Sequence, residues 1–195
     1  MKLEKKDVLF VIAVSAVYCS LAAGFSLVST VLPDKTVLTN PIAHGSLNLR
    51  EIIGHFAWGV VAAIVTLRVR YILLGGFLAV LIDADHLIGL LHVEGIQRMG
   101  HSITFAVISV VVLMIVFRKN DYRLGVIVGT SILTHISYDI FSTESGFPIL
   151  TPFVNKIIEF PREDWIIFEI AAIAIIGIVS VLVTKKESIS STFVR

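Results

Sequence analysis

Long apolar runs separated by short polar clusters organise most of the chain. A helix needs about 20 mostly apolar residues to cross a bilayer, and six segments reach or approach that length. These predicted spans are Val8–Leu32, Glu51–Leu67, Tyr71–Leu91, Ser102–Phe117, Tyr122–Phe141 and Asp164–Thr184. The pattern predicts an all-α fold, a polytopic transmembrane bundle of about six helices. Internal repeats are absent from the sequence, so we expect a single membrane domain over residues 1–195.

The first apolar run has two interpretations. Lys5 and Lys6 precede it, and a basic start followed by an apolar stretch is also typical of a cleavable signal peptide. The run is longer than the roughly 7–15 residues of a signal-peptide core. We therefore expect a retained helix.

Composition agrees with lipid as the solvent of this chain. Apolar residues make up 56% and charged residues 16%, whereas ordinary soluble domains have roughly 45–50% and 25%. A basic stripe interleaved with aromatic residues, the pattern typical of nucleic-acid binding, does not occur. We expect membrane lipid as a partner and no nucleic acid.

The distribution of Lys and Arg predicts the orientation. Cytoplasmic loops near helix ends carry an excess of these residues. With six spans, the side without the termini carries only five of the 16: Lys35, Arg50, Arg98, Lys156 and Arg162. We expect a multi-pass protein of the plasma membrane with both termini in the cytoplasm.

The histidines all fall at the extracytoplasmic level of this predicted topology. They are His44, His55, His86, His92, His101 and His135. Ionisable groups inside a bilayer cost roughly 2.5–3.5 kcal/mol on the insertion scale and usually face the interior of a bundle. Because the topology was drawn from Lys and Arg alone, the common level of the histidines indicates a shared site.

Spacing along the helices narrows the site. His135 and Asp139 are four residues apart and share a helix face, which suits a divalent cation that accepts nitrogen and oxygen. Asp83 and His86 are three apart and also share a face. Asp85 is rotated by about 160–200° from Asp83 on a regular helix. It joins the same site only if the helix bends or ends there; otherwise it serves a neighbouring helix.

Arg98 and the start of the fourth span form a candidate anion site. A helix N-terminus exposes backbone N–H groups, and His101 and Ser102 lie at this one. Arg98, just before them, is placed to hold a phosphate or carboxylate with two hydrogen bonds. It also fits a surface charge that snorkels to the headgroups.

Each candidate also has a purely structural interpretation. A single intramembrane histidine such as His55 more often hydrogen-bonds between helices, and His135 with Asp139 fits a buried ion pair. His44 and His92 fit ordinary loop residues. Three polar groups on the third span are costly to bury, so the set as a whole indicates a site more strongly than any member does.

These residues, in this order, resemble the YdjM-like family of membrane-bound metal-dependent hydrolases. The matching stretches are His55–Gly59, Leu81–His86, Arg98–Ser102 and His135–Asp139, followed by Gly146 and Pro152. The resemblance covers about residues 50–153, which we expect to form the hydrolase-like core.

Three positions depart from the family pattern. Ile82 stands where the family usually has proline, and Gly100 where it usually has threonine. Gln97 takes the place of a histidine that commonly precedes the arginine. Because of these departures, the family's substrate, and the role of one residue as a metal ligand or proton donor, do not carry over directly to this chain.

The resemblance implies a metal site with a defined set of residues. Its metal positions are His55, Asp83, Asp85, His86, His101, His135 and Asp139. Asp85 is expected to bridge two metals or act as a general base, and His101 with Arg98 to hold a phosphate or donate a proton. The expected ion is Zn²⁺, which lowers the pKa of bound water toward about 7.

The predicted function is hydrolysis of a lipid or lipid-linked ester at the extracytoplasmic side. A looser similarity to soluble zinc phospholipases C, in the ligand set and the His-x-x-x-Asp helix, suggests a phosphoester. A Gly-x-Ser-x-Gly motif for a serine nucleophile is absent from the sequence, so metal-activated water is the simpler mechanism.

Two other functions use the same residues. A transporter of divalent cations or protons normally has polar groups at several depths, whereas the cytoplasmic halves of the predicted helices lack buried carboxylates. A non-catalytic scaffold uses polar residues only to hold helices together, and its thermal stability does not respond to a chelator.

Overall fold

The computed structural model describes residues 3–28, 48–91, 98–117, 121–142, 146–154 and 156–193. Its α-helices are α1 (Lys5–Val28), α2 (Leu49–Ala63), α3 (Val69–Leu81), α4 (Ile103–Val116), α5 (Tyr122–Ser142) and α6 (Trp165–Phe193). Short 3₁₀ segments are η2 (Ile64–Thr66), η3 (Ile82–Leu91), η4 (Met99–His101) and η5 (Arg162–Asp164). The predicted all-α bundle of about six helices is confirmed. His44 and His92 lie outside the described residues.

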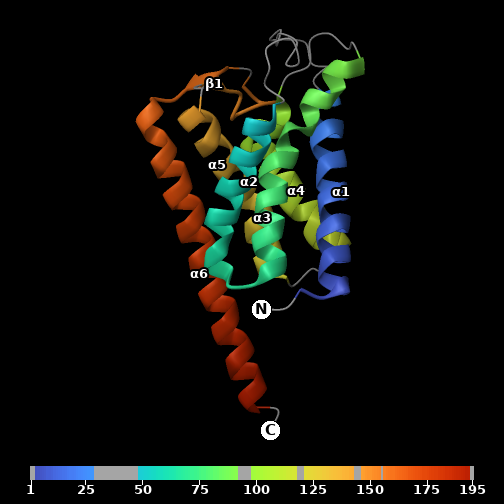
Figure 1. Cartoon of the computed structure of the whole chain (residues 1–195), viewed down its shortest axis with the longest axis vertical. Coiled ribbons are helices and arrows are strands. Elements are labelled where there is room, and N and C mark those ends of the chain that lie inside the picture. Colours follow the sequence, from blue (N-terminus) through green and yellow to red (C-terminus); the bar gives the residue numbers. More distant parts are fainter. Residues whose placement is uncertain are drawn as a thin grey trace.

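The helices run up and down between two ends of the bundle (Figure 1). Strands β1 (Gly146–Phe147) and β2 (Ile158–Glu159) pair antiparallel, with Gly146 opposite Glu159. We call the end that carries them the ribbon end. Helix α1 begins and α6 ends at the opposite end, which agrees with an even number of passes (Figure 1).

Four helical segments of the described chain are long and apolar enough to cross a membrane. They are Lys5–Val28, Leu49–Thr66, Tyr122–Ser142 and Arg162–Ile189. Helices α3 and α4 have 13 and 14 residues and are shorter. The third span differs from the predicted helix Tyr71–Leu91, because α-helix ends at Leu81 and the chain continues as the 3₁₀ segment η3.

Helix α5 forms the centre of the bundle. It contacts α2, α3, α4 and α6, and its buried residues surround the whole helix. Small residues such as Gly125 and Ser131 let the neighbours approach closely. The hydroxyls of Ser131 and Thr134 donate to carbonyl oxygens one turn earlier. These two hydroxyls are therefore satisfied within the helix, without water.

Helices α2 and α3 cross in direct backbone contact. A Cβ atom added at Gly59 would overlap the carbonyl oxygen of Gly75, and a Cβ at Gly75 would press on Gly59. The absence of a side chain at both glycines is therefore what allows the two helices to cross this closely. This crossing holds the first turns of α2, with His55, against the end of α3.

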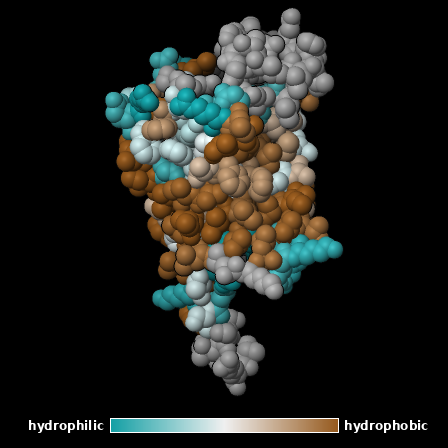
Figure 2. Space-filling model, viewed as in Figure 1, coloured by the Kyte–Doolittle hydropathy of each residue, from teal (hydrophilic) through white to brown (hydrophobic). Residues whose placement is uncertain are grey.

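The outer surface of the bundle is suited to lipid. Helix α6 packs through one face and exposes the other, including Ile167, Ile170 and Val181. Figure 2 shows an apolar belt around the middle of this face, with hydrophilic residues at both ends. An apolar surface of this extent is what a bilayer covers.

Candidate metal centre

The predicted site residues come together near the ribbon end of the bundle. Because α2 and α4 begin there while α3 and α5 end there, residues far apart in sequence reach the same depth (Figure 1). The cluster consists of His55, Asp83, Asp85, His86, Arg98, His101, His135 and Asp139, from four segments of the chain. The histidines and aspartates are at most 8% exposed. We call this set the His/Asp cluster.

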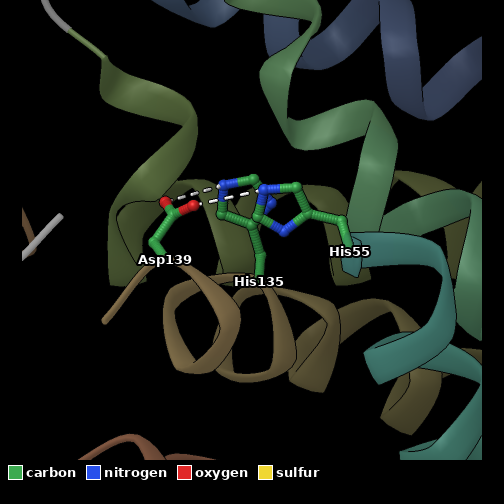
Figure 3. Close-up of side chains that lie close together, drawn as sticks. All are labelled: His55, His135 and Asp139. Atoms are coloured by element: carbon green, nitrogen blue, oxygen red, sulfur yellow. Dashed lines mark ion pairs between the residues drawn. The ribbon is translucent and has the colours of Figure 1, made fainter. Parts of the chain in front are cut away.

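Helix α2 delivers His55 from its second turn. Asn48 caps the helix, and its side chain accepts a hydrogen bond from the backbone N–H of Glu51 at 3.0 Å. The His55 ring stacks on the His135 ring, with centroids 3.9 Å apart and planes within 4° (Figure 3). The edge of Tyr138 packs against His55 and fills the space beside Gly54.

The 3₁₀ segment η3 points three polar residues inward. Asp83, Asp85 and His86 are all buried and belong to one cluster, whereas on a regular α-helix Asp83 and Asp85 would point to nearly opposite sides. The sequence predicted that Asp85 would join the site only if the helix bends or ends near it, and α3 does end at Leu81. The change of helix type is thus what brings both carboxylates to the cluster.

Asp83 is the hub of the cluster. Its Oδ1 lies 3.4 Å from the Nε2 atoms of both His86 and His135, and 3.5 Å from that of His101. Its Oδ2 lies 3.6 Å from Nε2 of His55. One carboxylate therefore faces imidazoles from all four segments of the cluster.

Asp85 occupies the far side of the cluster from His55. Its Oδ1 lies 3.6 Å from Nε2 of His86, and its Oδ2 lies 3.7 Å from Nδ1 of His101. The Ser26 hydroxyl of α1 donates to Asp85 Oδ2 at 3.3 Å. Sequence reasoning missed Ser26, because a serine in an apolar helix carries no signal of its partner.

Helix α5 supplies a pre-oriented pair. His135 Nε2 lies 3.2 Å from Asp139 Oδ2, and Asp139 Oδ1 lies 3.2 Å from His55 Nε2 (Figure 3). His135 Nδ1 donates to the carbonyl oxygen of Ala79 at 2.6 Å. Since a carbonyl only accepts, the proton must be on Nδ1, and neutral His135 turns the lone pair of Nε2 toward the cluster. This is the arrangement that supports metal-bound histidines.

Arg98 and His101 close the cluster from the start of the fourth helix. Arg98 Nη2 donates to Nε2 of His101 at 2.7 Å and lies 3.4 Å from Asp83 Oδ1 and 3.7 Å from Asp139 Oδ2. The Nε2 atoms of His101 and His135 are 2.8 Å apart. With both rings neutral, their lone pairs face each other, and a cation would relieve the repulsion.

The donor set fits a divalent metal ion. Three groups have ligand atoms within 4.8 Å of one another: His55, His135 and Asp139; Asp83, His101 and His135; Asp83, Asp85 and His86. Ligands 2.0–2.1 Å from a tetrahedral ion lie about 3.3 Å apart, close to the 3.2–3.6 Å between the imidazole nitrogens and carboxylate oxygens.

Charge and burial point the same way as the distances. Three buried carboxylates face one guanidinium, so the cluster carries excess negative charge when the imidazoles are neutral. Within the described residues, Asp85 Oδ1 and Asp139 Oδ2 are buried without a hydrogen-bond donor. Unsatisfied buried charge is costly, and a bound cation would remove that cost.

The β1–β2 ribbon covers one side of the cluster. Phe147 is fully buried, and its ring lies parallel to that of His101, with centroids 6.2 Å apart. The Ile103 backbone N–H donates to the carbonyl oxygen of Ile149, which ties the ribbon to α4. The ribbon thereby shields the cluster from water.

Glu169 on α6 is a buried carboxylate that sequence reasoning missed. It is 6% exposed, and neither carboxylate oxygen has a hydrogen-bond donor in the described part of the chain. The ion pairs that define the His/Asp cluster do not include it. Its signal in the sequence was a single acidic residue inside the most apolar predicted span.

Comparison with known proteins identifies the family. No curated protein and no solved structure matches the chain. A family model described as YdjM inner membrane protein matches residues 51–194, which includes every residue of the cluster. The match extends beyond residues 50–153, where the resemblance in the motifs lies, and agrees with the apolar helices of a membrane protein. The chain therefore belongs to the YdjM inner membrane protein family.

Proposed function

We propose that the chain is a membrane-bound metal-dependent hydrolase. The observation that carries the proposal is Asp83, whose carboxylate faces imidazoles from four separate segments in a buried, negatively charged cluster. Such a convergence of nitrogen and oxygen donors is costly without a cation and typical of Zn²⁺ and related ions.

The proposed ligands are His55, Asp83, His86, His135 and Asp139. When bound there, Zn²⁺ would activate a water molecule at neutral pH and polarise the scissile group. The backbone carbonyl of Ala79 holds His135 in the tautomer that binding needs. Asp83 and His135 each belong to two of the three possible ligand groups, so the cluster has enough donors to hold more than one ion.

Asp85, His101 and Arg98 have the proposed catalytic roles. Asp85 lies at the side of the cluster away from His55 and is held by Ser26, so it is placed to take a proton from water. Arg98 has 15% of its side chain exposed, more than the other members, and stands where a substrate enters. It would bind phosphate oxygens, while His101 beside it would donate a proton to the leaving group.

The location of the cluster supports a lipid or lipid-linked phosphoester as substrate. The cluster lies near the ribbon end, where the apolar belt gives way to hydrophilic residues (Figure 2). At this depth a headgroup reaches the cluster while its chains stay in lipid. We propose that the ribbon end faces the extracytoplasmic side of the plasma membrane.

Transport of divalent cations is the alternative function of this cluster. A pathway needs polar groups through the bundle. Between the cluster and the opposite end, the centre of the described bundle is filled mainly by apolar side chains such as Leu74, Leu78 and Ile127. The polar groups buried there include the hydroxyls of Tyr18 and Ser131, which hydrogen-bond to each other. The single depth of the cluster favours hydrolysis over transport.

The first experiment measures metal and stability together. Purified wild-type protein should contain stoichiometric metal, and His135→Ala should lose it. A chelator should lower the melting temperature of the wild type by about 5–10 °C, the effect of losing a ligand held at about 100 times its Kd. Glu163→Gln, an exposed change at the same end, is the control.

The second experiment tests activity. The wild type should hydrolyse at least one member of a panel of phospholipids and lipid-linked phosphates, and Asp85→Asn should retain metal while losing that activity. The proposal would be overturned if the purified wild type contained no metal and a chelator left its melting temperature unchanged. That result would support a non-catalytic scaffold. Metal uptake into sealed vesicles without hydrolysis would support transport instead.

A further inference from the structure

A second polar site lies at the opposite end of the bundle. A cavity of about 260 Å³ opens between the start of α1, the starts of α3 and α5, and the end of α6. Its charged and aromatic lining is Asp7, Arg68, Arg70, Tyr71, Arg123 and Glu187. Three arginines and two carboxylates line the cavity, so its lining is net positive. A third carboxylate, Asp121, is outside the lining and lies 4.0 Å from Arg70 Nη2.

Arg123 is the buried cation of this cavity. It is 6% exposed. Its Nη1 and Nη2 atoms donate to the Glu187 carboxylate at 2.7 and 3.1 Å, and Nη2 also donates to the Thr184 hydroxyl at 2.8 Å. Its Nε has no hydrogen-bond partner in the described chain. A buried N–H without an acceptor, on a residue that lines a cavity, indicates that an acceptor belongs there.

Arg68 and Arg70, at the start of α3, differ in the contacts that their guanidinium groups make. Arg70 donates to the Tyr71 hydroxyl at 2.7 Å, lies over the Phe10 ring and is 3.8 Å from Asp7. The guanidinium of Arg68 makes neither an ion pair nor a hydrogen bond with any described residue, and it is exposed. Arg68 therefore keeps all its donors for a ligand at the rim.

The surroundings of the cavity favour a lipid over a free anion. Leu67, directly before Arg68, is 74% exposed, and Ile64 is 54% exposed. Leu67 has a φ of 52°, a left-handed conformation that is uncommon for any residue other than glycine. These apolar side chains lie next to the arginine rim. An apolar surface beside a cationic cavity matches acyl chains below a phosphate headgroup.

We propose that this cavity binds the phosphate headgroup of an anionic phospholipid. Arg68 and Arg123 contact the phosphate oxygens, and Leu67 and Ile64 contact the acyl chains. The site is separate from the His/Asp cluster and does not depend on the function proposed there. It anchors the ends of α1, α3, α5 and α6 to one leaflet.

Native mass spectrometry of the full chain in detergent tests this proposal. Phosphatidylglycerol should form adducts at lower concentration than phosphatidylcholine, and Arg68→Gln should weaken them roughly fivefold, the effect of one cation near a headgroup. Because the Arg68 guanidinium makes neither an ion pair nor a hydrogen bond with a described residue, this variant should fold. Lys185→Gln, an exposed cation on α6 outside the cavity lining, should bind like the wild type.

Three results would overturn the proposal. Equal binding of the two lipids would exclude a site for an anionic headgroup. Equal loss in both variants would assign the effect to general surface charge. Inorganic phosphate or glycerol phosphate that displaces the lipid at equal concentration would assign the cavity to a soluble anion.

Discussion

Among the three carboxylates of the His/Asp cluster, Asp83 has the most partners. Four imidazoles and Arg98 lie within 3.6 Å of its two oxygens. The other carboxylates are more peripheral, since Asp85 faces His86 and His101, and Asp139 faces His55 and His135 most closely. At the scale of single residues, the three carboxylates therefore differ in how many histidines they face, and we expect their substitutions to differ in effect.

Asp83→Asn should lower metal affinity by about 100-fold or more, because even groups that only support metal ligands contribute 10–100-fold. The substitution keeps the shape of the side chain but removes the charge that faces the histidines. Elemental analysis and metal titration of the purified variant measure the effect. Glu163→Gln is the matched control on the surface, and unchanged metal content in Asp83→Asn would contradict the central role of this residue.

At the scale of elements, two local departures from regular helix packing assemble the site. The end of α3 at Leu81 lets η3 turn Asp83 and Asp85 inward together. The glycine contact between α2 and α3 then sets how close His55 comes to η3. The residues at the glycine contact, Gly59 and Gly75, are not members of the cluster. The end of α3 and this contact together nevertheless set the distances between the cluster residues.

Gly59→Ala should destabilise the bundle by about 1–3 kcal/mol, the usual cost of overpacking. A Cβ at this position meets the backbone of α3, which cannot move aside as a flexible side chain does. Thermal unfolding in detergent measures the change. Gly24→Ala on α1 is the control, because no atom lies within 4 Å of its added Cβ and alanine favours a helix. Equal melting temperatures for the two variants would contradict the argument.

At the scale of the whole molecule, the two polar sites lie at opposite ends of an apolar belt. The His/Asp cluster is near the ribbon end, and the arginine-lined cavity is where α1 begins and α6 ends (Figure 1). The excess of Lys and Arg on the latter side predicts that it is cytoplasmic. This arrangement would place the cluster toward the outer leaflet and the cavity toward the inner one.

Cysteine labelling in intact cells should reveal that orientation. In a Cys19→Ser background, Glu163→Cys at the ribbon end should react with a membrane-impermeant maleimide, and Lys185→Cys should react only after the cells are opened. Both positions are exposed on the described helices. The reverse pattern would place the cluster in the cytoplasm and exclude an outer-leaflet substrate.

The sequence alone determined the helices, their approximate ends and the depth of the polar residues. Apolar runs long enough for a bilayer leave little choice of secondary structure, because backbone groups in lipid must be bonded within the helix. The pairs His135 with Asp139 and Asp83 with His86 followed from helix geometry. The pattern of motifs also indicated the family, which the family match confirms.

Only the tertiary structure decided which residues face one another. The helix that ends at Leu81, the Ser26 contact to Asp85 and the burial of Glu169 depend on neighbours that are distant in the chain. The arginine-lined cavity joins residues from four helices and has no local signature. The periodicity of a sequence indicates which face of a single helix is apolar. The contacts between helices depend on how all the helices pack together.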